Sequence, residues 1–414
     1  MAYNPIPGKM GTKLGTKRGR IILIGVVVVL ATVLFFVLRE GQPSDSPSPI
    51  PLSNNPIDNS DSNNSVTPLP TEIIATNLSI PWDIAFLPDD SLLVTERAGN
   101  LLLIEKNPDG IGFSKSRTSI KLPRAVPRGE GGLLGITLHP NFLHNTFIYI
   151  YMTTQSSKDG TKNAVFRYQY KNGKLSDEKT IISGIPGALY HDGGRMEFGP
   201  DGFLYITTGD AQDSSIAQDL KSLGGKILRL TDEGKVPTDN PFVDRAGAEP
   251  SIWSYGHRNP QGLAWDSAGN LWETEHGRSG ITSGMDEINL IQKGKNYGWP
   301  DIEGDKTKTG MEVPALHSGE KSTWAPASAV FYEGSSGKKS LFFGGLKGEA
   351  LYEAVLDGTK VKELKTHFHE TYGRIRTVRL GPDNMLYLTT SNRDGRGNPV
   401  DADDRIIKMD PKGL

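Results

Sequence analysis

After about position 71, the chain consists of short runs of alternating apolar and polar residues, separated by Gly, Pro, Asp and Asn. Alternation with a period of two, bounded by turn residues, is typical of β-strands. Gly and Pro number 48 and 27 of the 414 residues, which is too few for a disordered chain and generous for a protein rich in turns. The pattern therefore predicts an all-β region.

One unit repeats within this region: an apolar strand, a turn of the Pro-Asp or Asp-Gly type, and a second strand rich in Leu, Tyr and Thr. The clear copies turn at Pro88, Pro200, Asp266 and Pro382, and two looser copies turn at Pro140 and Pro326. The intervals between successive turns are 52, 60, 66, 60 and 56 residues. Such a period fits propeller blades, because solenoid repeats are usually shorter.

We therefore predict a six-bladed β-propeller over residues 71–414, with a pair of β-sandwiches that share these turns by coincidence as the alternative. We expect the last strand, residues 404–409, to pair with the start of the first blade near residues 71–77. That pairing would close the ring.

The first 70 residues have a different character. Lys9, Lys13, Lys17, Arg18 and Arg20 precede an uncharged apolar run at 21–38. Eighteen helical residues span roughly 27 Å, close to the ~30 Å hydrocarbon thickness of a bilayer. We predict a basic cytoplasmic segment at 1–20, a transmembrane anchor at 21–38 and a disordered linker, rich in Pro, Ser, Asn and Asp, at 39–70.

The positive charge before the anchor predicts a single-pass protein in the cell membrane whose C-terminal domain is extracytoplasmic. A cleaved signal peptide is the alternative, but no small-x-small cleavage site follows the apolar run.

Charge and cysteine content narrow the function further. The net charge is −2, from 46 basic and 48 acidic residues, so we expect no nucleic-acid partner, because such proteins usually carry a basic face. The chain has no cysteine, which excludes disulfides, thiolate catalysis and Cys-based metal sites.

Six polar clusters interrupt the strand pattern at strand ends, where a blade needs only turn residues. They are 128–130, 190–192, 209–210, 257–259, 344–347 and 373–376. Equivalent loops of propeller blades gather around one mouth of the central channel, so we expect the clusters to form one cationic pocket with a histidine. Arginine forks pair well with carboxylates, which suits a planar ligand with several carboxylates.

Five ordered motifs make a specific resemblance: GEGGLLGITLHPNF, YHDGGRMEFGPDGFLYITTGDA, GHRNPQGLAW, DEINLIQKGKNYGWP and GRIRTVRLGPDNMLYLTTS. From about residue 80 to 409 the chain resembles the pyrroloquinoline quinone (PQQ)-dependent soluble glucose and aldose sugar dehydrogenases. The resemblance implies an oxidoreductase with PQQ and calcium as cofactors. It would oxidise an aldose at the anomeric carbon to a lactone and pass the electrons to an external acceptor.

The resemblance also implies roles for individual residues. His191 matches the catalytic base that takes the hydroxyl proton of the sugar, and Asp210 matches the carboxylate that orients this histidine. Arg258 would stabilise negative charge on the quinone oxygen, and Asn259 would lie over the quinone. Lys347, Arg374 and Arg376 would bind the carboxylates and carbonyl oxygens of the cofactor. Without the resemblance, Asp210 fits a turn aspartate and the three basic residues fit a solvated edge.

Glu130 departs from the family pattern, because the soluble glucose enzymes have a glutamine there that touches the cofactor. The sequence leaves three possibilities for Glu130: a negative charge facing an anionic ligand, a protonated carboxyl, or an ion pair with Arg128.

The resemblance implies two calcium sites. The backbone carbonyls of Gly277 and Arg278 would hold the calcium on the quinone, since calcium tolerates backbone oxygen ligands. Glu287 and Tyr297 would hold a second, structural ion, although Glu287 also fits an exposed charge at a strand end. The insert at 278–284 is longer than in the soluble glucose enzymes and could redirect this loop.

Two other functions remain open. A calcium-dependent lactonase on a propeller would need acidic metal ligands in the channel rather than a ring of basic residues. A non-catalytic propeller that binds a protein or glycan would not need all of the matched polar residues. Substrate contacts are expected on variable loops such as 155–162 and 301–321.

Overall fold

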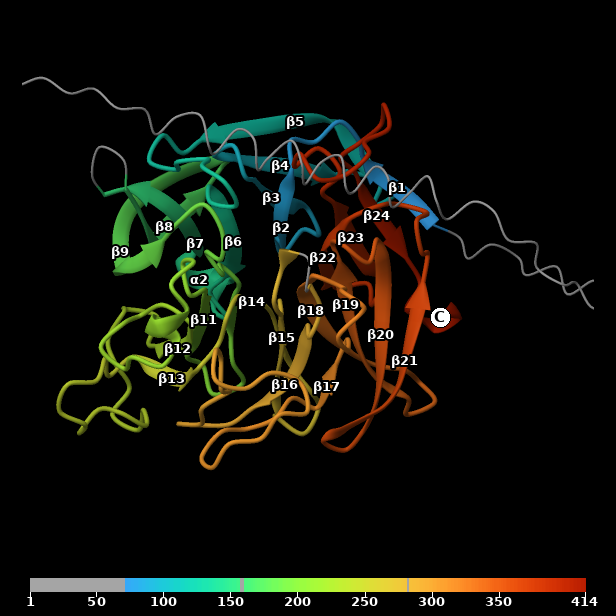
Figure 1. Cartoon of the computed structure of the whole chain (residues 1–414). Coiled ribbons are helices and arrows are strands. Elements are labelled where there is room, and N and C mark those ends of the chain that lie inside the picture. Colours follow the sequence, from blue (N-terminus) through green and yellow to red (C-terminus); the bar gives the residue numbers. More distant parts are fainter. Residues whose placement is uncertain (1–70, 157–159, 281–282) are drawn as a thin grey trace, which may run out of the picture. The chain divides into compact units, whose positions relative to one another are not determined.

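The computed structural model describes residues 71–156, 160–280 and 283–414. Its strands form six four-stranded antiparallel sheets, which are the blades of a β-propeller (Figure 1). The predicted fold class is confirmed for these residues. Among them, no helix is long and apolar enough to cross a membrane. The segments predicted at 1–20, 21–38 and 39–70 lie outside the described residues.

The first five blades each use four strands consecutive in the chain. Blade 1 contains β2 (Pro81–Phe86), β3 (Leu92–Glu96), β4 (Asn100–Lys106) and β5 (Phe113–Lys121), and blade 2 contains β6 (Leu133–Leu138), β7 (Phe147–Gln155), β8 (Thr161–Lys171) and β9 (Lys174–Gly187). Blade 3 contains β10 (Met196–Phe198), β11 (Leu204–Thr208), β12 (Lys226–Leu230) and β13 (Ile252–Tyr255). Blade 4 contains β14 (Pro260–Trp265), β15 (Leu271–Glu275), β16 (Glu287–Ile291) and β17 (Leu316–His317), and blade 5 contains β18 (Pro326–Glu333), β19 (Lys339–Gly345), β20 (Ala350–Asp357) and β21 (Lys360–His367).

Blade 6 joins the two ends of the described chain. It contains β22 (Ile375–Leu380), β23 (Leu386–Thr390), β24 (Ile406–Met409) and, from the other end, β1 (Thr71–Ala75). Thr71 pairs with Met409 and Ile73 with Ile407. The predicted closure of the ring is therefore confirmed.

Among the described residues, helical turns are few and short. α2 (Phe142–Asn145) lies in the β6–β7 connection, η1 (Ser214–Ala217) follows β11, and η3 (Pro411–Gly413) follows β24.

The fifth repeat was placed wrongly by the sequence pattern. Pro326 is the first residue of β18 rather than a turn residue. The hairpin of blade 5 turns at 334–337, where Gly334 N donates to the carbonyl of Lys338 and Gly337 N to that of Gly334. Because this turn reads Gly-Ser-Ser-Gly, it lacks the Pro-Asp signal that marks most of the other blades.

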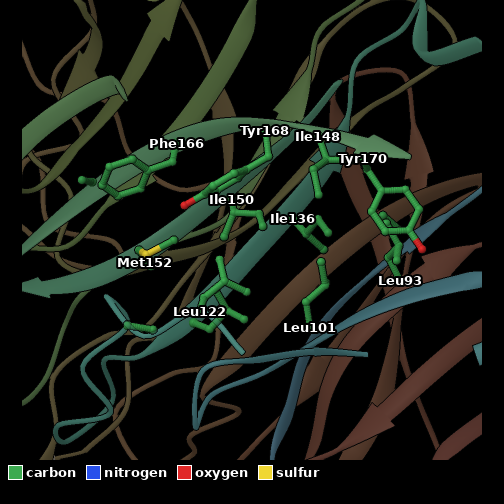
Figure 2. Packing of buried hydrophobic residues seen from close by; sticks show 14 of the residues in the cluster. Leu93, Leu101, Leu122, Ile136, Ile148, Ile150, Met152, Phe166, Tyr168 and Tyr170 are labelled. Atoms are coloured by element: carbon green, nitrogen blue, oxygen red, sulfur yellow. The ribbon is translucent and has the colours of Figure 1, made fainter. Parts of the chain in front are cut away.

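The apolar core lies between neighbouring blades. Figure 2 shows Leu93 and Leu101 of blade 1 packed toward Ile136, Ile150 and other residues of blade 2. These four side chains are fully buried, as expected when both faces of a blade are covered by its neighbours. Burial of this apolar surface, at roughly 25 cal/mol per Å², is the main force that holds the blades together.

Charged residues fill the interior between the innermost strands. Asp83 of β2 is fully buried and forms ion pairs with Arg195 at 2.6 Å and with Arg379 at 3.0 Å. Arg379 of β22 also pairs with Glu197 of β10. Since these residues come from blades 1, 3 and 6, the ion pairs connect distant parts of the ring.

Candidate active site

A cavity of about 940 Å³ collects residues from all six polar clusters. Its lining includes Glu130, Tyr190, His191, Asp210, Arg258, Leu346, Lys347 and Arg374. The loops that carry these residues connect the second strand of a blade to its third, or one blade to the next. In antiparallel blades those connections lie at the same end of the ring. The predicted convergence of the clusters is confirmed.

His191 and Asp210 form a hydrogen-bonded pair in this cavity. His191 Nδ1 lies 2.7 Å from Asp210 Oδ1, and the Asp210 side chain is only 2% exposed. Asp210 Oδ1 also accepts from Gln212 N, and Oδ2 accepts from Trp299 Nε1 at 2.9 Å. The carboxylate is thus fixed from three sides and fixes the imidazole in turn. Since Nδ1 is engaged, Nε2 is the ring atom left for a ligand.

Close backbone contact holds this pair together. His191 has a φ of 66°, in the left-handed region that most residues avoid. A Cβ on Gly209 would lie 2.0 Å from the carbonyl oxygen of His191. Only glycine therefore fits at position 209, directly before Asp210, and it lets the loops of blades 2 and 3 meet.

Glu130 is an ionised, paired carboxylate. It bonds Arg396 at 2.6 Å and accepts a hydrogen bond from His191 N. Burial opposes ionisation, but the nearby Arg396 and His276 hold the pKa of Glu130 at about 2. The ion pair and the lowered pKa both favour the ionised form, and the ion-pair partner is Arg396 rather than Arg128. The carboxylate lines the cavity with its charge largely balanced.

Arg258 and Asn259 are neighbours that lie differently. Arg258 lines the cavity and donates to Ser279 Oγ at 3.0 Å; burial lowers its pKa. Asn259 is fully buried and does not line the cavity. Its Oδ1 accepts from Gly193 N, whereas its Nδ2 is buried without an acceptor. The structure therefore does not place the predicted cofactor contact of Asn259 in the cavity lining.

The predicted cationic residues split into free and paired groups. Lys347 is exposed to the cavity, and no carboxylate of the described residues forms an ion pair with it. Arg374 lines the cavity but pairs with Asp394 at 2.9 Å and donates to the carbonyl of Leu346.

Arg376 lies outside the cavity lining. It is 5% exposed and lies against Trp82, and burial lowers its pKa to about 10. Arg376 therefore belongs to the interior of the ring, where it remains charged at neutral pH.

The charge of the cavity is mixed rather than purely cationic. Five basic residues and three acidic ones line it: Arg258, Arg278, Lys347, Arg374 and Arg396, with Glu130, Asp210 and Asp286. Arg374 and Arg278 are paired with carboxylates outside the lining, but Lys347 and Arg258 form no ion pair with a carboxylate of the described residues, so these two cations favour an anionic ligand. The cavity volume is near the upper end of the range of about 300–1,000 Å³ for ligand sites, so a tricarboxylated quinone such as PQQ fits the residues present.

Gly277 and Arg278 lie in the cavity lining, as predicted for the cofactor-side calcium. The carbonyl of Arg278 already accepts from Gly284 N at 3.1 Å, which leaves it one lone pair. The Arg278 side chain pairs with Glu303 at 2.6 Å. The backbone carbonyls of this loop are thus compatible with a calcium ligand role.

Glu287 and Tyr297 do not line the large cavity. They lie together in a small internal space beside Glu275. Burial raises the pKa of Glu287 to about 8, and the Tyr297 hydroxyl donates to the carbonyl of Leu290 and accepts from Gln292 N. The hydroxyl is therefore engaged, and the interpretation of Glu287 as an exposed charge is wrong.

Further oxygens gather next to Glu287 on β15 and β16. Glu275 lies opposite Glu287, and Glu273 lies opposite Asn289. Glu273 Oε1 and Asn289 Oδ1 are buried without a hydrogen-bond donor. Burial raises the pKa of Glu273 well above its ordinary value. A divalent cation would satisfy these oxygens, so the residues fit a structural calcium with a wider ligand set than Glu287 and Tyr297.

Sequence reasoning missed several lining residues. Trp299 and Asp286 belong to a motif that was recognised, but no role was assigned to them. Arg396 and His276 line the cavity as well, and burial lowers the pKa of His276 to about 4. Of the loops expected to contact substrate, neither 301–321 nor the described part of 155–162 lines the cavity.

Comparison with known proteins agrees with the fold and the cavity. A family model described as Glucose / Sorbosone dehydrogenase matches residues 78–400. Aldose sugar dehydrogenase YliI of Escherichia coli (strain K12) is 36% identical over 364 residues, which cover 82% of this chain and 92% of that protein. Quinoprotein glucose dehydrogenase B of Acinetobacter calcoaceticus is 34% identical over 268 residues, covering 58% of this chain and 54% of that protein.

A solved structure extends this similarity to three dimensions. The PQQ-bound aldose sugar dehydrogenase of Streptomyces coelicolor is 37% identical, with a TM-score of 0.72, and the match covers 82% of this chain and 98% of that one. Fold and cavity together define a propeller oxidoreductase of the quinoprotein class. The chain belongs to the glucose/sorbosone dehydrogenase family.

Proposed function

We propose that this chain is a PQQ-dependent dehydrogenase that oxidises an aldose at the anomeric carbon to a lactone and passes the electrons to an external acceptor. The observation that carries the proposal is the His191–Asp210 pair, which faces the same cavity as the basic residues Arg258, Lys347 and Arg374. The named activities of the relatives and the PQQ-bound state of the Streptomyces coelicolor structure support the substrate class and the cofactor.

His191 is the proton acceptor in this proposal. Its Nε2 takes the proton of the anomeric hydroxyl, and Asp210 stabilises the imidazolium that results through the bond to Nδ1. PQQ, when bound, supplies the two-electron acceptor for the hydride that leaves the anomeric carbon. Arg258 stabilises negative charge that develops in the cavity.

The basic residues hold the cofactor. Lys347 offers an unpaired ammonium group to a carboxylate, and Arg374, which is oriented by Asp394, offers its remaining N–H groups. Asn259 would act on the site through its side-chain oxygen, which fixes the backbone at Gly193. Arg376, which lies in the ring interior outside the cavity lining, would act through the positive charge of its guanidinium group.

We extend the proposal to two calcium ions. One would use the carbonyls of Gly277 and Arg278 at the cavity, where calcium would polarise the bound quinone. The other would satisfy the oxygens of Glu273, Glu287 and Asn289 inside blade 4.

The proposed location is the cell surface. The basic segment before the apolar run at 21–38 supports a single membrane anchor with the propeller on the extracytoplasmic side. The linker at 39–70 would join this anchor to the propeller.

The test is reconstitution of the purified full chain, in detergent, with PQQ and calcium, followed by dye reduction across a panel of aldoses. His191→Ala should abolish dye reduction while leaving PQQ binding within a few-fold of the unchanged chain. His144→Ala is the matched control, since His144 is exposed on α2. A folded chain that neither binds PQQ nor reduces dye would overturn the proposal and favour a non-catalytic binding propeller. Lactone hydrolysis without dye reduction would favour a lactonase.

A further inference from the structure

Asp286 accepts four hydrogen bonds at the wall of the cavity. It directly precedes β16, is 2% exposed and lines the cavity. Its Oδ1 accepts from Gly277 N at 2.8 Å. Its Oδ2 accepts from Thr323 Oγ1 at 2.8 Å, Trp324 N at 2.5 Å and Ala325 N at 2.9 Å. One carboxylate thus joins the loop of blade 4 to the segment that leads into blade 5.

The segment at Trp324 and Ala325 continues the chain of contacts. The carbonyl of Trp324 accepts from Lys347 N at 3.1 Å, and the carbonyl of Ala325 accepts from Leu346 N at 3.0 Å. The carbonyl of Leu346 in turn accepts from Arg374 Nη1 at 2.8 Å. Each of these contacts is a direct hydrogen bond between described residues. The series ends at Lys347 and Arg374, two basic residues that line the cavity.

We infer that Asp286 is a positioning residue for cofactor binding, which sets the relative placement of the Gly277 loop, Lys347 and Arg374 across blades 4, 5 and 6. The inference rests on the proposed function, because it takes these three groups to hold PQQ and its calcium. Asp286 acts through other residues and is not itself assigned a contact with cofactor or substrate.

The chemistry of the site requires a carboxylate. All four partners are N–H or O–H donors, and a carboxylate accepts at both oxygens. An asparagine would turn an NH₂ group toward donors at one of the two positions, so that buried donors lose their partner. The Gly277 loop has little room to adjust, because a Cβ there would lie 2.2 Å from the carbonyl oxygens of Gly284 and Met285.

Asp266 provides a matched control in the same blade. It follows β14 at the other end of blade 4 and also accepts four hydrogen bonds, from Ala268 N, Asn270 N, Asn270 Nδ2 and Trp272 Nε1. Asp266→Asn therefore removes a carboxylate that lies in the same blade and accepts the same number of hydrogen bonds as Asp286. Asp266 does not line the cavity.

The experiment compares Asp286→Asn with Asp266→Asn in the full chain. Hydrogen exchange without cofactor should quicken at 323–325 and 346–348 in Asp286→Asn only, because the contacts that protect these segments are lost. PQQ affinity, followed by quenching of tryptophan fluorescence in calcium buffer, should fall at least tenfold in Asp286→Asn. It should stay within threefold of the unchanged chain in Asp266→Asn.

Thr323→Val is the milder variant, for the case that Asp286→Asn does not fold. It removes one donor and leaves the carboxylate three partners, so PQQ affinity should fall about threefold with normal folding. Equal PQQ affinity in the folded Asp286 and Asp266 variants, or faster exchange confined to the Gly277 loop, overturns the inference. If Asp286→Asn does not fold, unchanged PQQ affinity in Thr323→Val overturns it. If the unchanged chain itself does not bind PQQ, the proposed function fails, whereas the exchange comparison still decides whether Asp286 positions the cavity wall.

Discussion

Replacement of Asp210 by asparagine tests the central pair of the cavity most directly. The three groups that Asp210 contacts, His191 Nδ1, Gln212 N and Trp299 Nε1, can all act as donors. An amide has only one acceptor oxygen, so its NH₂ must face at least one of these groups. The variant should therefore lose the charge-assisted bond to His191 without changing the size of the side chain.

The expected fall in kcat follows from the loss of that one hydrogen bond. A hydrogen bond to a charged group contributes about 1.5–3 kcal/mol. If it is fully formed to the imidazolium in the transition state, its loss lowers kcat by roughly 10- to 150-fold, since about 1.4 kcal/mol corresponds to a factor of ten. PQQ affinity should change less than threefold, because Asp210 is not expected to hold the cofactor.

The assay is steady-state dye reduction with saturating PQQ, calcium and aldose. Asp213→Asn is the control, because Asp213 caps η1 in the same loop through Ser215 N and does not contact His191. A kcat for Asp210→Asn within threefold of the unchanged chain would refute the assignment. An equal loss in Asp213→Asn would show that the loop, rather than the pair, had been disturbed.

Three further predictions concern single residues. Asp83→Asn leaves the buried Arg195 and Arg379 without their shared carboxylate, so the free energy of unfolding should fall by about 3–5 kcal/mol in urea titrations; a fall below ~1 kcal/mol would contradict this. Burial raises the pKa of Asp192 to about 7, so its protonated form stabilises the fold below pH ~4 and that contribution is lost as the pH rises through 7. In Asp192→Asn the urea midpoint should therefore depend less on pH between pH 5 and 8 than it does in the unchanged chain. The same pH dependence in both proteins would contradict this prediction. Lys347→Met should weaken PQQ binding about tenfold by fluorescence titration with an unchanged melting temperature, and unchanged affinity would remove Lys347 from the site.

The fold was predictable because its signals are local. Each hairpin turn and each alternating strand is encoded within about ten residues, so five of the six repeats were recognised at their turns. The fifth failed because residues 334–337 turn without proline or aspartate, and Pro326 gave a false signal at the start of a strand. The expected pairing of residues 404–409 with the region near 71–77 is confirmed by the pairing of β1 with β24.

The sequence predicted which loops form the site, but not which of their side chains point into the cavity. Arg374 precedes β22 and reaches the cavity, whereas Arg376, the second residue of β22, points into the ring interior. The ion-pair partners Asp394 and Arg396 come from another loop, and Arg396 meets Glu130 across 266 positions of sequence. Asp286 likewise depends on donors 37 to 39 residues away. No local pattern encodes such pairings, because they arise only when the blades meet.

The pairing of β1 with β24 determines how the protein responds to proteolysis. A cut before Thr71 would separate the propeller from everything N-terminal to it and leave all six sheets complete. A cut between Ala75 and Pro81 would instead separate a strand of five residues from the propeller chain, leaving it held by its pairing with β24, the hydrogen bond from Tyr372 Oη to Thr71 Oγ1 and the packing of Ala75. Ile406–Met409 would then be an unpaired edge, and such edges recruit strands from other molecules. A propeller with six complete sheets and one with an unpaired edge are thus separated by cuts only a few residues apart in the chain.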